Sequence, residues 1–150
     1  RKWMGAHALF RGLARRMGND TQAFLGGDME QRDYTDRLAH YGTRLVQNLH
    51  GHHHWEDRKF FPELSGADAR FDRGLDMLEA DHQEMDLLLD RFTRGSNRMI
   101  QLAALDPAQV PEEARHTHDR IAGLQGFLDR HLTDEEDLTV PILLHHAMRG

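Results

Sequence analysis

Apolar residues recur every three or four positions along almost the whole chain, and this spacing constrains the fold more than any other feature. Prolines and β-branched residues are sparse, and the alternation of apolar and polar residues that marks strands is missing. The pattern predicts helices over about residues 2–18, 31–61, 68–105 and 111–138, then a kink or break at Pro141 and a short helical tail to about residue 148.

Four amphipathic helices with short connections predict an all-α fold, an antiparallel up-and-down four-helix bundle with a short C-terminal helical extension. The length of 150 residues is that of one domain, so we expect residues 1–150 to fold together. A helix of 30 residues is about 45 Å long, and the three longer helices can therefore enclose a site at mid-height.

The chain contains 12 histidines and no cysteine, which makes a metal site of a particular kind the leading hypothesis. Histidine titrates near neutral pH and binds metals through nitrogen. The lack of cysteine excludes disulfides, zinc fingers, iron-sulfur clusters and thiol catalysis. A metal site in this chain therefore consists of nitrogen and oxygen donors, which favour iron, manganese or zinc over thiolate-bound metals.

The charge balance limits the classes of partner. Nineteen Lys and Arg residues against 25 Asp and Glu residues give a net charge of −6, which disfavours nucleic acid and anionic membrane surfaces. No apolar run approaches the roughly 18 residues of a membrane span, and the N-terminal residues begin a helix pattern rather than a signal peptide. We expect a cytoplasmic protein that binds neither nucleic acid nor membrane.

Each predicted helix carries one histidine on its apolar stripe: His7, His52, His82 and His131. In the second helix Glu56 shares the stripe with His52, and in the fourth helix Glu135 shares it with His131. Residues four positions apart lie on one face of a helix, so each pair can offer two donors to one metal ion.

Residues 52–64 and 131–143 form an internal repeat. The segments HHHWEDRKFFPEL and HLTDEEDLTVPIL share His, Glu at +4, an acid at +5, Pro at +10 and Leu at +12. Carboxylates left unpaired in a bundle core would be unfavourable by several kcal/mol each, or would protonate, whereas two dications reverse that preference. The repeat therefore predicts two symmetric metal positions that are bridged or flanked by the two glutamates.

With these motifs the chain resembles the hemerythrin-like proteins of the HHE cation-binding family over essentially all its length. The resemblance is carried by His7, the HHxxEDxxFFP segment from His52, the EADHQEMD segment around His82 and HLTDEE from His131. It implies a non-haem di-iron centre with an oxo or hydroxo bridge, with zinc or manganese as substitutes, in a monomer or homodimer. It also implies a coordination position open to O2, peroxide or nitric oxide. The implied ligands are His7, His52, Glu56, His82, His131 and Glu135.

The sequence departs from the oxygen-carrying members of that family at two positions. Those members have a second histidine one turn after the first in the third helix, where this chain has Asp86. Asp86 stays open as a seventh metal ligand, a partner of a ligating histidine or a solvated acid. Their last helix has an aspartate at +5 from its histidine, whereas here Glu135 competes with Glu136, and the repeat favours Glu135. Such a site, more anionic or more open, disfavours simple reversible O2 carriage.

Three functions follow as alternatives. The first is that the centre binds or activates O2 or a related oxidant in redox, sensing or oxidase-type chemistry. The second is that the protein is an oxidase or oxygenase that acts on an organic substrate. The third is that it stores or delivers metal without redox chemistry. Thiol-dependent iron-sulfur repair, known for some relatives, is disfavoured without cysteine. His53 and His54 are interpreted as surface residues or partners of ligands, and a shifted register that uses His53 and Asp57 stays open.

Overall fold

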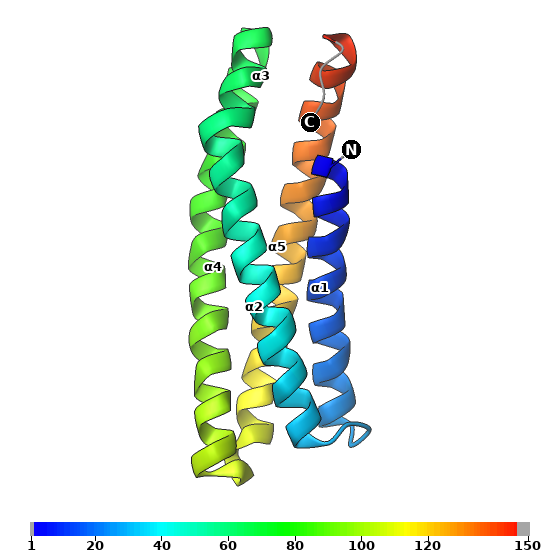
Figure 1. Ribbon diagram of the computed structural model, residues 1–150, viewed down its shortest axis with the longest axis vertical. Helices are drawn as coiled ribbons and strands as arrows, with labels where there is room; N and C mark the ends of the chain where they lie inside the picture. Colours follow the sequence, from blue (N-terminus) through cyan, green and yellow to red (C-terminus); the bar gives the residue numbers. More distant parts are fainter. Residues whose placement is uncertain (1, 147–150) are drawn as a thin grey trace.

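Four long helices run up and down beside one another in the computed structural model, which describes residues 2–146 (Figure 1). The elements in order are α1 (Lys2–Leu25), α2 (Gln31–Trp55), the π-helical turn η1 (Glu56–Phe60), α3 (Phe61–Ala67), the 3-10 turn η2 (Ala69–Phe71), α4 (Asp72–Leu105), the 3-10 turn η3 (Pro107–Gln109) and α5 (Val110–His145). No strand occurs among these residues. The all-α four-helix bundle predicted from the apolar spacing is confirmed.

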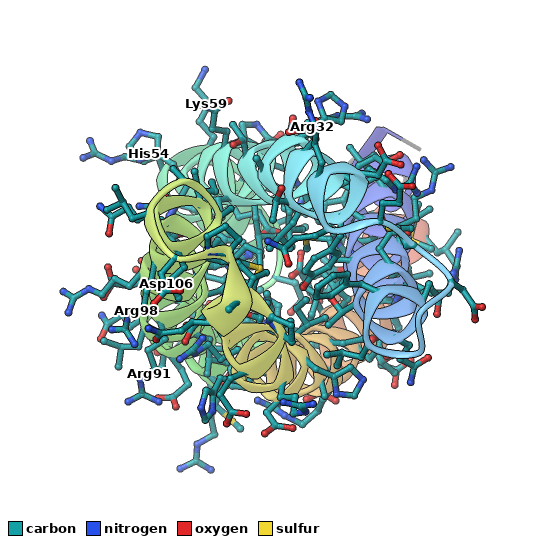
Figure 2. The ribbon with its side chains drawn as sticks, turned by 90° about the horizontal axis from the view of Figure 1, so that it is seen from below. Arg32, His54, Lys59, Arg91, Arg98 and Asp106 are labelled. Carbon is teal, nitrogen blue, oxygen red and sulfur yellow. The ribbon has the colours of Figure 1, made fainter. Side chains whose placement is uncertain are left out.

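Each of the four long helices packs against two neighbours: α1 and α4 both contact α2 and α5. Seen along the bundle, charged side chains such as Arg32, Lys59, Arg91 and Arg98 point away from the common core (Figure 2). None of the described helices has the length and apolar character that crossing a membrane requires.

Two apolar clusters fill the interior, one toward each end of the bundle. The larger includes Phe10, Leu49, Met85, Leu128 and Leu132. The smaller consists of Trp3, Phe60, Phe61, Leu64, Leu75, Leu78 and Ile142. On every long helix the predicted metal ligands fall between members of the two clusters, so apolar side chains bound the site from both ends.

Helix α1 continues to Leu25, and the end predicted at Gly18-Asn19-Asp20 is wrong. Contacts with the start of α2 hold the extra turns in place. Thr21 Oγ1 donates to Met17 O at 2.8 Å and lies 2.9 Å from the hydroxyl of Tyr34. The ring of Phe24 stacks on Tyr34 with the centroids 4.7 Å apart. Tertiary packing here outweighs the weak helix preference of glycine, asparagine and aspartate.

The helix that begins as α2 does not stop at Pro62 but changes type before it. Proline lacks an N–H and its ring collides with the carbonyl four residues earlier, so a regular α-helix is strained at that point. The π turn Glu56–Phe60 lies directly ahead of the proline, and α3 then continues to Ala67. At the other proline, α5 runs unbroken past Pro141, which is exposed, to His145. The last two residues of the predicted tail, 147 and 148, lie outside the described residues.

We predict that Gly42→Ala destabilises the bundle although alanine favours helix. A Cβ at Gly42 would lie 3.1 Å from ring carbons of Phe92, which is buried. Overpacking of this kind costs about 1–3 kcal/mol, against a gain of about 1 kcal/mol in helix propensity. Urea unfolding followed by circular dichroism should show a net loss of about 1 kcal/mol.

Gly51→Ala is the matched control, because Gly51 lies in the same helix, is exposed and has nothing within 4 Å of the added Cβ. It should raise the free energy of unfolding by about 0.5–1 kcal/mol. Equal stabilisation by both substitutions would contradict the close packing of α2 against α4.

Candidate metal centre

Two groups of metal-ligating side chains meet inside the bundle. In each group, one ligand atom from every member lies within 4.8 Å of the others. The first group is His53, His82 and His131, and the second is His7, His52, Glu56 and Glu135. The members come from all four long helices and from the π turn, so the site depends on the complete bundle.

The two glutamates join the groups, because each directs one carboxylate oxygen to either side. Glu56 Oε1 lies 3.2 Å from His82 Nε2, and Glu56 Oε2 lies 3.3 Å from His52 Nε2. Glu135 Oε2 lies 3.1 Å from His131 Nε2, and Glu135 Oε1 lies 3.5 Å from His7 Nε2. Both carboxylates are completely buried. Their placement is that of two bridges between adjacent cation positions.

Most donor atoms that face this interior have no hydrogen-bond partner. They are Nε2 of His7, His52, His82 and His131, both ring nitrogens of His53, Glu56 Oε1 and Glu135 Oε2. Buried polar atoms without partners are rare in proteins because each has lost its hydration without compensation. So many of them aimed at one interior volume match what a pair of bound cations would satisfy.

Three of the histidines are held from outside by carboxylates. The Nδ1 atoms of His7, His82 and His131 lie 2.8, 2.8 and 3.1 Å from carboxylate oxygens of Glu136, Asp57 and Asp81, respectively. Arg11 in turn donates to Glu136 at 2.9 and 3.2 Å. With the proton on Nδ1, each ring presents the lone pair of Nε2 to the interior, which is the arrangement typical of metal-binding histidines.

Burial favours the neutral form of three of the imidazoles. Desolvation is the largest cause that lowers the pKa of His7, of His131 and of His53, the last to about 2. A nearby carboxylate opposes this effect at each of them. Neutral imidazole is the form that binds a metal.

Charge is concentrated between His82 and Glu56. Burial alone would lower the pKa of His82, but the carboxylates of Glu56 and Asp57, 3.2 and 2.8 Å from its ring nitrogens, outweigh it and raise the pKa. Burial likewise opposes ionisation of Glu56, yet the imidazoles of His52 and His82, with Nε2 atoms 3.3 and 3.2 Å from its oxygens, hold its pKa below the usual value. The Glu56 carboxylate is therefore ionised at neutral pH.

Comparison with protein families places this site in a known context. The sequence profile of the hemerythrin HHE cation binding domain matches residues 1–143. The chain belongs to this family. No significant match is found among curated proteins or among solved structures. Membership implies a cation-binding site with histidine and carboxylate ligands, and the two groups in the core of this HHE bundle supply that chemistry.

The HHE bundle brings together the six residues that the resemblance implied, and it leaves out Asp86. The Asp86 side chain is 54 % exposed and lies 3.3 Å from His50 Nδ1, on the surface. Of the two competing glutamates in α5, Glu135 faces the interior, whereas Glu136 contacts His7 from outside.

His53 is the site residue that sequence reasoning missed. It is buried, with 4 % exposure, and its ring stacks on His82 with the centroids 3.8 Å apart. The shifted register that pairs it with Asp57 does not occur, because Asp57 contacts His82 instead. His53 lies four residues after Leu49 and three before Glu56, so the apolar spacing admits it as well as His52. The aspartate at position 86, where the oxygen carriers have a histidine, was the signal that could have directed attention to a further imidazole.

A pocket on the surface approaches the site beside α3 and α4. It is lined by Asp57, Phe61, Pro62, Ser65, Asp72, Leu75, Asp76 and Glu79. Four of these residues are acidic, and the partly exposed Asp57 contacts His82 from the pocket side. Asp57 thus links an acidic, solvent-exposed pocket to a buried imidazole.

We predict that the metal-free HHE bundle loses stability as the pH falls below about 6.5, the unperturbed value for histidine. In that range His7, His53 and His131 bind a proton more readily in the unfolded chain than in the folded one, because burial lowers the pKa of each in the folded state. Each contributes a slope of up to about 1.4 kcal/mol per pH unit, with stability rising with pH. Urea unfolding in the presence of a chelator, at several pH values, measures this slope.

His53→Ala should reduce the slope, whereas His54→Ala, at the neighbouring exposed position, should leave it unchanged (Figure 2). A slope that both variants share with the unaltered protein would show that His53 is not buried in its neutral form.

Proposed function

We propose that the chain is a hemerythrin-like di-iron protein. Two iron ions with an oxo or hydroxo bridge bind His7, His52, His53, His82, His131, Glu56 and Glu135, and the centre binds or activates O2, peroxide or nitric oxide. The observation that carries the proposal is the set of buried donor atoms without partners, divided into two groups around two shared glutamates. The reaction of the centre with this small ligand serves redox, sensing or oxidase-type chemistry.

The donor set favours iron over zinc. One position is offered three imidazoles and one oxygen from each glutamate, which exceeds the four ligands that zinc prefers. Nitrogen and oxygen donors in larger number suit iron or manganese. When bound, the iron pair supplies the electrons for chemistry with an oxidant.

The second position is offered only two imidazoles and two carboxylate oxygens. Fewer protein donors leave more coordination positions for a small exogenous ligand, so we place the ligand on the side of His7 and His52. The two apolar clusters at either end of the site exclude water from it.

The outer carboxylates have a defined task in this proposal. Asp57, Asp81 and Glu136 accept the Nδ1 protons of their histidines and fix the ring orientation. This makes Nε2 a stronger electron donor to a metal. Since His53 supplies the imidazole that the Asp86 position lacks, the site is not short of nitrogen donors, and reversible O2 binding re-enters the set of activities to test.

We predict that His53→Ala removes at least one of about two irons per chain, because it deletes a nitrogen donor from the three-imidazole group. Elemental analysis after expression with ample iron, together with the absorption bands of an oxo bridge, measures the loss. His131→Ala should have the same effect.

His54→Ala and Asp86→Ala are the controls, because both side chains are exposed and outside the two groups. Both should keep the iron content and the spectrum of the unaltered protein. Less than about two irons in the unaltered protein, with no oxo-bridge bands, would contradict the di-iron proposal.

The remaining outcomes separate the alternative functions. Turnover that requires an organic substrate, rather than O2 or peroxide alone, would identify an oxidase or oxygenase. Tight zinc binding without any spectral response to O2 would favour a non-redox storage, delivery or structural role.

A further inference from the structure

A tryptophan lies against both glutamates of the site. The indole Nε1 of Trp3 donates to Glu56 Oε2 at 3.0 Å and to Glu135 Oε1 at 2.9 Å. Trp3 is 2 % exposed, and all three side chains are buried. A single N–H is thus shared between two carboxylates that belong to different helices.

The two oxygens that accept this hydrogen bond both face the same metal position. Glu56 Oε2 is the oxygen nearest His52, and Glu135 Oε1 is the oxygen nearest His7. The other two oxygens, which face His82 and His131, accept no hydrogen bond. The indole therefore makes two otherwise similar positions unequal.

The indole is held in this place by its neighbours. Its ring lies 4.3 Å from the ring of His7, one helical turn further along α1, and 5.9 Å from the ring of Phe60, measured between centroids. Trp3 also belongs to the smaller apolar cluster. Packing on several sides makes its N–H a fixed feature of the site rather than a chance contact.

We propose that Trp3 is a positioning residue that sets the order in which the two positions fill. Its N–H competes with a metal ion for the carboxylate oxygens at the His7 and His52 position, whereas the position of His53, His82 and His131 has no such competitor. Hydrogen bonds to ionised acceptors are the strong ones, so the competition is substantial. The first ion then binds beside the three histidines, and the second binds more weakly. This inference rests on the proposed function, because it requires two ions.

Titration of the metal-free protein with Zn²⁺, a diamagnetic ion, tests the order directly. The chain has two tryptophans, so its NMR spectrum contains two indole N–H signals, and the Trp55→Phe variant assigns them. The Trp3 signal should shift mainly with the second equivalent of Zn²⁺. A full shift with the first equivalent, or no shift with either, would overturn the proposal.

Trp3→Phe retains an aromatic ring and deletes the N–H, and calorimetry of Zn²⁺ binding measures the consequence. The ratio of the second Kd to the first should fall about tenfold, as expected for the loss of a hydrogen bond to a charged group. Trp55→Phe is the matched control, since Trp55 is 36 % exposed and outside both groups of ligands, and it should leave the ratio unchanged.

The outcomes distinguish this proposal from the proposed function. Binding of fewer than two Zn²⁺ ions by the unaltered protein would contradict the filling order proposed here, whereas the di-iron proposal itself is decided by the iron content. Binding of two ions with equal affinity, or equal weakening of both positions by Trp3→Phe, would contradict the role of Trp3 alone. If Trp3→Phe does not fold, the NMR titration of the unaltered protein still decides.

Discussion

The burial of two carboxylates, Glu56 and Glu135, is the constraint on which the rest of the structure depends. Both are fully inaccessible and lie in the middle of an apolar bundle, where an isolated anion is strongly unfavourable. Five imidazoles surround them, and burial lowers the pKa of three of these, His7, His53 and His131. The arrangement favours positive charge brought in from outside, which is the chemistry of the cation-binding family to which the chain belongs.

Residues outside the two groups of candidate ligands also stabilise the buried charge. The outer carboxylates fix the imidazole rings, and Arg11 fixes one of these carboxylates, Glu136, in turn, so a chain of polar contacts leads from the core toward the solvent. The two apolar clusters confine the buried polar side chains to the segment of the bundle that lies between them. Apolar packing therefore dominates toward the two ends of the bundle, and the candidate ligands lie between them.

The sequence predicted the bundle and six site residues because both follow from one periodicity. A histidine on the stripe of an amphipathic helix faces the core, and His7, His52, His82 and His131 all do so, although His52 is only partly buried. The errors arose where a neighbouring helix, not the local sequence, decides. Packing of Phe24 on Tyr34 extends α1. His53 lies in the core beside His82, although only His52 was assigned to the apolar stripe of α2, and Asp86 lies on the surface. Such contacts cannot be read from a single helix.

The adjacency of His52 and His53 has a mechanical consequence. Consecutive residues of an α-helix point about 100° apart, so these two rings lie on opposite sides of the direction in which α2 faces the core. A small rotation of α2 about its own axis would therefore move the ring of His52 and the ring of His53 in opposite senses, one toward the centre of the bundle and the other away from it. The two groups of candidate ligands are thereby joined through one peptide unit of α2, so a movement of this part of the helix displaces a donor of both groups at once.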